Sequence, residues 1–154
     1  MSSQTFDCVV CGETVAELGI RPVPLEEPLT ADTTRRIDPI RVGTGGIVPN
    51  AGIAMSRLGL RVAALCVVGD DDWSSAIKRR LNAENIDTSG MVTHEGSATS
   101  ATAVLIDAQG DHAFAFHQGA SRLIDKQICL ERIDLFARSR WALFGYYNLL
   151  PNLE

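Results

Sequence analysis

The 154-residue sequence has a shortage of basic residues, and it contains no long apolar run. Its 14 Lys and Arg residues against 19 Asp and Glu residues give a formal net charge of −5 at pH 7. Without a basic excess to neutralise phosphates, neither a nucleic-acid partner nor an acidic membrane surface is expected. No apolar run approaches the roughly 18 residues that span a bilayer. The first seven residues lack the basic and apolar regions of a secretory signal, so we expect a cytoplasmic protein with no membrane partner.

Cysteine is also scarce, with four residues in the whole chain. Cys8 and Cys11 form a C-x-x-C pair, but they lie inside the apolar run FDCVVCG at 6–12, which is typical of a buried strand. Residues three apart on a strand point to opposite faces, and no second Cys or His pair stands at zinc spacing. We therefore predict reduced thiols with a structural role.

The remaining composition is that of a globular chain, with 45 % hydrophobic and 21 % charged residues. Continuous apolar runs that predict strands buried on both faces occur at 6–11, 61–68 and 141–144. Apolar spacing predicts helices at 47–58, at about 73–85 and around Ile124 to Ala137. This alternation predicts an α/β fold with a doubly wound, mostly parallel sheet.

Three segments do not fit the alternation. A further strand is predicted at about 15–21, and the proline-containing stretch 22–40 predicts a loop or edge-strand excursion. Two strand-like runs at 99–107 and 112–117 are joined by a turn with Gly110, which predicts a β-hairpin. On the second of these runs His112 shares a face with Phe114 and Phe116.

Gly43, Gly45 and Gly46 stand directly before the helix predicted at 47–58. Backbone N–H groups in such a turn can approach a polar ligand closely. Asn50 follows in the first turns of the helix, and its amide both donates and accepts, as sugar hydroxyls do. The spacing matches neither the G-x-G-x-x-G fingerprint nor a Walker loop. A strand-to-helix turn without a ligand explains the glycines equally well.

Acidic residues at 70–72 precede the second predicted helix. They could bind a cation, but carboxylates in this position more often cap a helix, and we predict the cap.

The glycine turn and its helix carry a family resemblance. The stretch GGIVPNAGIA at 45–54, followed by RLG at 57–59, resembles the first signature of the PfkB, or ribokinase-like, carbohydrate kinase family. The match continues in order through VGDDDW at 68–73, LNAENID at 81–87 and the hairpin and Gly-Ala stretch at 102–121. It extends from about residue 6 to residue 144.

The resemblance implies a doubly wound α/β domain with a small β-sheet lid over a sugar or nucleoside. The lid segments would be about 19–42 and 99–117, and such lids often pair between subunits as a homodimer. Residues 1–154 would then be the N-terminal part of a single ribokinase-like domain, with the C-terminal half of the family fold absent.

Carried over residue by residue, the resemblance assigns substrate contacts to Glu17, Gly45, Gly46, Asn50 and Tyr147. Glu17 stands where relatives commonly place an Asp that binds sugar hydroxyls. Gly45, Gly46 and Asn50 match the turn that contacts the sugar. Tyr147 lies near a position that is often acidic in ribokinases, where its phenol would contact the substrate.

Two departures from the family limit these expectations. Val15 and Ile47 replace the Asn and Lys of pentose-specific relatives, which leaves the sugar open. The second signature, a Gly-Ala-Gly-Asp loop that holds the catalytic base, is missing from these 154 residues. We therefore expect no catalytic residue here. ATP and Mg²⁺ are implied for the full-length parent, and neither is expected to bind tightly to this chain.

Two functions remain open at this stage. One is the sugar-binding half of an ATP-dependent carbohydrate or nucleoside kinase, which transfers the γ-phosphoryl group to a sugar hydroxyl. The other is a non-catalytic binding or dimerisation module of the same fold. If the chain is half a domain, a sheet that stops after the strand at 141–144 exposes an edge and an apolar face, so we expect the isolated chain to be marginally stable, to aggregate, or to be ordered only within a larger assembly.

Overall fold

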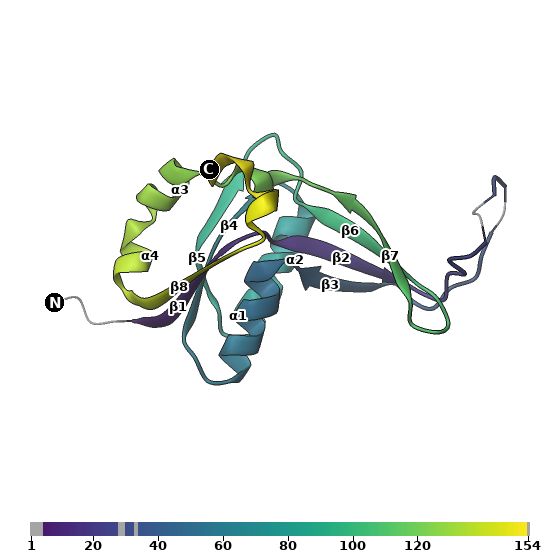
Figure 1. Cartoon of the computed structure of the whole chain (residues 1–154), viewed down its shortest axis with the longest axis horizontal. Coiled ribbons are helices and arrows are strands. Elements are labelled where there is room, and N and C mark those ends of the chain that lie inside the picture. Colours follow the sequence, from purple (N-terminus) through teal and green to yellow (C-terminus); the bar gives the residue numbers. More distant parts are fainter. Residues whose placement is uncertain (1–4, 28–29, 33, 154) are drawn as a thin grey trace.

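The computed structural model describes residues 5–27, 30–32 and 34–153, and it contains two four-stranded sheets that extend in opposite directions from a common junction (Figure 1). The first sheet has the order β5-β4-β1-β8, with parallel neighbours throughout. The second has the order β3-β2-β6-β7, in which a parallel β2–β6 pair lies between two antiparallel pairs. The strands of the first sheet are β1 (Phe6–Gly12), β4 (Val62–Gly69), β5 (Asp87–His94) and β8 (Ser139–Gly145). Those of the second are β2 (Val15–Ile20), β3 (Arg41–Gly45), β6 (Ala101–Ile106) and β7 (His112–His117).

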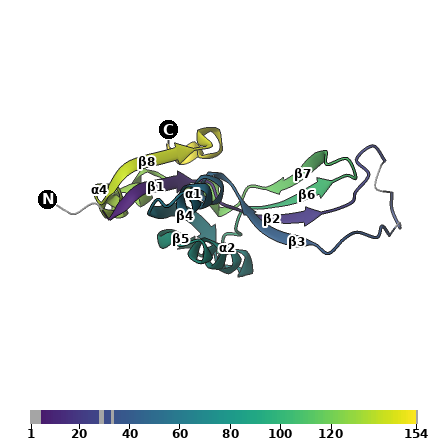
Figure 2. The same ribbon diagram turned by 90° about the horizontal axis from the view of Figure 1, so that it is seen from below.

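Helices cover both faces of the first sheet (Figure 2). They are α1 (Ile47–Arg57) and α2 (Asp72–Ala83) on one face, and α3 (Lys126–Glu131) and α4 (Ile133–Ala137) on the other. Val10 of β1 packs in a buried cluster with Val48 of α1 and Ile77 of α2. Its neighbour Val9 packs in a second cluster with Leu135 of α4. Both faces of β1 are thus apolar and covered, and the predicted α/β fold with a parallel sheet is confirmed.

The two cysteines of the C-x-x-C pair lie on opposite faces of β1. Cys8 belongs to the cluster under α1 and α2, whereas Cys11 belongs to the cluster under α4. All four cysteines are free thiols, and burial raises the pKa of Cys66 to about 12. The predicted opposite orientation of Cys8 and Cys11 is therefore confirmed, and they act as small core residues.

The second sheet contains the predicted hairpin. β6 and β7 pair along their whole length, and the turn between them has Gly110 at φ +98°. The Asp107 carboxylate accepts the N–H groups of Gln109, Gly110 and Asp111, which fixes the turn. His112 and Phe114 contact each other edge to face at 5.1 Å, as their shared strand face predicts.

A buried polar junction ties the two sheets together. The Asp71 carboxylate caps α2 by accepting the Ser74 N–H at 3.0 Å. It also accepts the N–H and the hydroxyl of Thr99, each at 2.7 Å, just before β6 begins. Burial alone would raise the pKa of Asp71, but the hydrogen bonds from Thr99 and Ser74 outweigh it and lower the pKa. The cap predicted at 70–72 is confirmed.

A second contact closes the junction between the two sheets. Ser121 is buried, and its hydroxyl donates to the Thr14 carbonyl at 2.8 Å while it accepts the Thr14 N–H at 3.2 Å. The short link between β1 and β2 is held in place in this way. The position of the second sheet relative to the first is therefore fixed from two sides.

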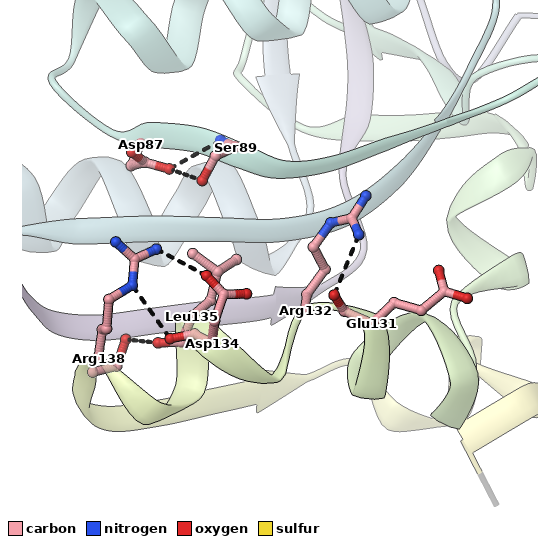
Figure 3. Close-up of polar contacts among 8 residues, drawn as sticks. Asp87, Ser89, Glu131, Arg132, Asp134, Leu135 and Arg138 are labelled. Atoms are coloured by element: carbon pink, nitrogen blue, oxygen red, sulfur yellow. Dashed lines mark hydrogen bonds and ion pairs between the residues drawn. The ribbon is translucent and has the colours of Figure 1, made fainter. Parts of the chain in front are cut away.

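The third predicted helix is broken into short pieces. A 3-10 turn at Ala120–Leu123 precedes α3, and Arg132 leaves helical geometry, with φ −114° and ψ 23°, between α3 and α4. After α4 the Arg138 guanidinium turns back onto Asp134, whose carboxylate it meets at 3.1 Å (Figure 3). Within the described ranges no helix combines the length and the apolar character needed to cross a membrane.

Candidate functional site

A pocket of about 470 Å³ lies where the second sheet meets the carboxyl end of β1 and the start of α1. Ligands of open α/β sheets bind at the carboxyl ends of parallel strands, which is where this pocket lies. Its lining residues are Glu13, Val15, Glu17, Gly46, Asn50, Thr102, Phe114, Phe116, Tyr146 and Leu149. Three of the five residues assigned from the sequence, Glu17, Gly46 and Asn50, are brought together here.

Strand register places a row of side chains on one face of the second sheet. Glu17 of β2 stands opposite Gly43 of β3 on one side and Thr102 of β6 on the other. Thr102 in turn stands opposite Phe116 of β7. Phe114 lies two residues from Phe116, so both rings share this face. The face therefore offers a carboxylate, a hydroxyl and two aromatic rings to whatever occupies the pocket.

Gly45 does not line the pocket, but the absence of a side chain there leaves room for the Glu17 carboxyl group. It is buried, and a Cβ there would lie 2.5 Å from the Glu17 carboxyl carbon. Gly43 leaves more room, since a Cβ there would lie 3.9 Å from the Glu17 Cβ. The Glu17 side chain is thus laid across the glycine-bearing strand β3, with Gly45 beneath it.

The first turn of α1 forms another wall of the pocket. Gly46 is the residue before the helix and has φ +83°, which favours glycine. A Cβ there would also meet the Glu13 carbonyl oxygen at 2.6 Å. The Val48 N–H donates to that same carbonyl at 3.1 Å, so the start of α1 is held against the link between β1 and β2. Asn50 is exposed one residue after Pro49 and lines the pocket.

Glu13 was not predicted from the sequence. It is 5 % exposed, lines the pocket, and its Oε1 has no hydrogen-bond partner within the described structure. Burial raises the pKa of Glu13. The signal that could have found it is an acidic residue placed directly after Gly12, at the end of a strand buried on both faces.

Tyr147 does not line the pocket. Its hydroxyl donates to the Leu153 carbonyl at 2.8 Å, and the side chain lies over the C-terminal turns. Its neighbour Tyr146, in the left-handed region at φ +57°, lines the pocket instead. The residue assigned from the sequence, Tyr147, therefore lies outside this pocket, and the lining residue beyond β8 is Tyr146.

Among the residues described around the pocket, the ionisable side chains include acidic but no basic ones. Two carboxyl groups line it, and no Lys, Arg or His belongs to its described lining. Over residues 5–27, 30–32 and 34–153, no group of three His, Cys, Asp or Glu side chains is arranged to hold a metal ion. The arrangement suits a polyhydroxylated ligand, whose hydroxyls can donate to carboxylates and both donate to and accept from the Asn50 amide.

The sequence is similar to those of known carbohydrate and nucleoside kinases. A family model described as pfkB family carbohydrate kinase matches residues 5–140. The chain is 29 % identical over 105 residues to fructokinase-1 of Zea mays, covering 68 % of this chain and 32 % of that protein. It is 28 % identical over 120 residues to a nucleoside kinase of Methanothermobacter thermautotrophicus, covering 78 % of this chain and 38 % of the relative.

Solved structures share the fold. The crystal structure of a PfkB protein from Polaromonas sp. JS666 superposes with a TM-score of 0.74 at 23 % identity, over 90 % of this chain and 44 % of the other. The chain therefore spans roughly a third of the curated relatives it matches and less than half of this structural neighbour.

Proposed function

The chain belongs to the pfkB family of carbohydrate kinases, and from this premise we propose that it is the part of a sugar or nucleoside kinase that binds the phosphoryl acceptor. The observation that supports the proposal is the pocket shared by Glu17, Gly46 and Asn50 at the meeting of the two sheets. Its volume of about 470 Å³ lies within the ordinary range for small-molecule sites.

Each wall of the pocket has a role in this proposal. The Glu17 carboxylate accepts hydrogen bonds from two neighbouring hydroxyls of the acceptor. The Asn50 amide donates to one hydroxyl oxygen and accepts from another. Phe114 and Phe116 present apolar faces to the C–H groups of the sugar ring. Gly46 allows the start of α1 to approach the ligand, and Gly45 keeps the Glu17 carboxylate in position.

The second sheet is proposed to act as a lid. It stands beyond the end of the first sheet and supplies Glu17, Thr102 and both phenylalanines to the pocket (Figure 1). A sheet that covers the acceptor would exclude water from the reacting hydroxyl, which protects the transferred phosphoryl group from hydrolysis.

The phosphoryl donor does not fit this pocket. Its triphosphate is strongly anionic, whereas the pocket is lined by two carboxyl groups without a basic side chain. We therefore propose that ATP and Mg²⁺, which supply and stabilise the transferred group in such kinases, bind a part of the kinase domain outside these residues. The residues of this chain bind and orient the acceptor hydroxyl, and none is assigned as a catalytic residue.

A second candidate function is self-association without catalysis. β3 and β7 are the edges of the second sheet, and Val42 and Phe114 on them are 58 % and 60 % exposed. Edge strands with exposed apolar side chains are suited to pair with a second copy. A homodimer through these lid strands is compatible with acceptor binding, or it could be the sole function of the chain.

Binding to this chain tests the first proposal directly. Calorimetric titration with D-fructose, D-ribose and adenosine should show saturable binding of at least one of them. Asn50→Ala should weaken that binding about tenfold, the effect of losing one or two hydrogen bonds. Asn82→Ala, which removes an exposed amide on α2, is the matched control and should bind as the wild type does.

The two candidate functions give different results. A folded chain that binds none of the three compounds but forms dimers supports the association module and contradicts acceptor binding. ATP hydrolysis or sugar phosphorylation by these 154 residues alone would contradict both.

A further inference from the structure

Glu13 is the least satisfied charged side chain in the candidate pocket. It is 5 % exposed, and its Oε1 finds no hydrogen-bond donor among the described residues. Burying a carboxyl oxygen without a donor costs free energy, and buried polar groups in folded proteins are nearly always paired. A donor supplied by a ligand would remove this cost.

The backbone of Glu13 is held against the start of α1. Its carbonyl accepts the Val48 N–H at 3.1 Å, and a Cβ on Gly46 would come within 2.6 Å of that oxygen. Glu13, Val15 and Glu17 all line the pocket. Two carboxyl-bearing residues, four positions apart in the sequence, therefore border it.

The other groups of the pocket define the ligand by charge. Besides Glu13, the titratable groups that line it are Glu17 of β2 and Tyr146 after β8, while α1, β6 and β7 contribute none. A sugar that carries a phosphate or carboxylate would meet two carboxyl groups and no basic partner in this lining. Repulsion between these carboxyl groups and an anionic ligand disfavours the binding of that ligand.

We propose that Glu13 is a specificity-determining residue of the acceptor site: its carboxyl group accepts a hydrogen bond from a hydroxyl of an uncharged sugar or nucleoside, and together with Glu17 it excludes acceptors that carry phosphate or carboxylate. This inference rests on the proposed function, because it takes the pocket to be the acceptor site. It adds a residue and a substrate class to that proposal.

The test compares matched ligands and variants of the 154-residue chain. Wild type, Glu13→Ala and Glu13→Gln are titrated with D-fructose, D-ribose and adenosine, and with D-fructose 6-phosphate and D-gluconate as anionic probes. The wild type should bind an uncharged compound at least tenfold more tightly than either anion. Glu13→Ala should weaken that binding about tenfold, since one hydrogen bond to the ligand is lost. Glu95→Gln, an exposed carboxyl after β5, is the control and should change nothing.

A pH series separates a direct contact from a structural role. Burial raises the pKa of Glu13, and a hydroxyl that donates to the carboxylate favours its ionised form. Affinity for the uncharged ligand should therefore rise between pH 5 and pH 7.5 in the wild type. The pH dependence of the affinity should be weaker in Glu13→Gln, where a neutral amide replaces the buried carboxyl group.

Each outcome is decisive. Unchanged affinity and an unchanged pH profile in Glu13→Gln and Glu13→Ala, while the wild type binds sugar, would overturn the role of Glu13 and leave the acceptor site standing. Equal binding of fructose and fructose 6-phosphate would overturn the charge selection. Absence of binding to any uncharged compound by the wild type would overturn the proposed function itself. If Glu13→Ala fails to fold, Glu13→Gln keeps the side-chain volume and carries the test.

Discussion

The carboxyl group of Glu17 occupies the space that a side chain on Gly45 would fill. A Cβ on Gly45 would lie 2.5 Å from the Glu17 Cδ and 3.1 Å from its Cγ. Glu17 stands opposite Gly43 in the β2–β3 pair, so its side chain leans along the strand toward Gly45. The two residues therefore form one unit, in which the glycine determines where the carboxylate lies.

Gly45→Ala should displace the Glu17 carboxylate from the pocket. We expect more than a tenfold loss of sugar affinity, because a hydrogen bond to a charged group contributes about 2 kcal/mol. We expect only a small change in the free energy of unfolding, because the group that must shift is the end of a flexible side chain. Calorimetric titration and urea denaturation measure the two effects separately.

Gly43→Ala is the matched control for this variant. A Cβ there would meet Glu17 only at ordinary contact distance, 3.9 Å from its Cβ. This variant should keep the sugar affinity of the wild type. Equal affinity of both alanine variants would show that the position of Glu17 does not depend on Gly45.

Asp71 should stabilise the junction of the two sheets. Asp71→Asn keeps an oxygen that can cap α2 but replaces one of the two oxygens that accept from Thr99, so we expect a loss of about 1–2 kcal/mol in the free energy of unfolding at pH 7. The pKa of Asp71 is lowered in the folded chain, so its contribution is present above the pKa of an unfolded Asp and is lost as the pH falls through the folded value. The difference between wild type and variant should therefore shrink in strong acid.

Urea denaturation at pH 7 and at pH 3 measures this dependence. Asp72→Asn is the control, since Asp72 is exposed in the first turn of α2. If Asp71→Asn were as stable as Asp72→Asn at pH 7, Asp71 would not stabilise the junction between the two sheets.

Much of the first sheet could be predicted because its strands are apolar on both faces. The run at 61–68 is displaced by one residue at each end from the observed β4, and the run at 6–11 is one residue shorter than β1. α1 was also predicted nearly to its ends, because Gly46 and Gly59 bracket its apolar face. In these segments local pattern and tertiary environment agree.

One edge strand of each sheet, β5 and β3, was missed. β5 contains Asp87, Ser89 and Gly90, so it shows little apolar pattern. Gly90 is required there by the close approach of the Ala64 carbonyl oxygen on β4, and an added Cβ would also lie 2.6 Å from the Leu135 Cδ1. β3 is glycine-rich, and its identity as a strand depends on pairing with β2. Such strands are specified by neighbours distant in the sequence, which no local pattern reveals.

Only part of the pocket could be predicted, because some of its residues stand out in the sequence and others do so only in the folded chain. Glu17, Gly46 and Asn50 belong to motifs that are visible in the sequence. Glu13 becomes notable only when its burial and its unpaired oxygen are known. Tyr146 replaces Tyr147 in the pocket because the left-handed backbone at Tyr146 turns the chain after β8.

Glu13→Gln should change the pH dependence of stability in a defined direction. Burial raises the pKa of Glu13 in the folded chain, so the protonated form stabilises the folded state. That stability is complete below the pKa of an unfolded Glu, about 4.3, and is lost as the pH rises through the raised folded value. Glutamine stays neutral, so the variant should gain on the order of 1 kcal/mol relative to wild type between pH 4 and pH 7.5.

Thermal unfolding at the two pH values measures this gain. It corresponds to a relative rise of about 2–4 °C in melting temperature for a chain of this size. Comparing two pH values cancels any constant effect of the buried amide. Glu95→Gln should show no such relative gain, and a Glu13→Gln curve parallel to wild type would show that Glu13 titrates as an exposed residue does.

The free edge of the first sheet should drive self-association. β8 is the outer strand of the order β5-β4-β1-β8, and Trp141 on it is 65 % exposed. Phe144 is 40 % exposed, although one face of its ring stacks on Phe136 at 5.8 Å. An unpaired edge beside exposed aromatic side chains is a template for strand pairing between molecules. Light scattering of the chain should therefore rise with concentration.

Trp141→Lys should reduce this scattering, because a charge on an edge strand opposes pairing with another edge. Leu58→Lys is the control: Leu58 is 82 % exposed at the end of α1, away from the edge, and its replacement should leave the scattering unchanged. Pairing through the lid strands would persist in Trp141→Lys as a dimer, so sedimentation distinguishes the two surfaces. A wild-type chain that stays monomeric at all concentrations and unfolds sharply at high temperature would show that β8 does not pair with strands of other molecules.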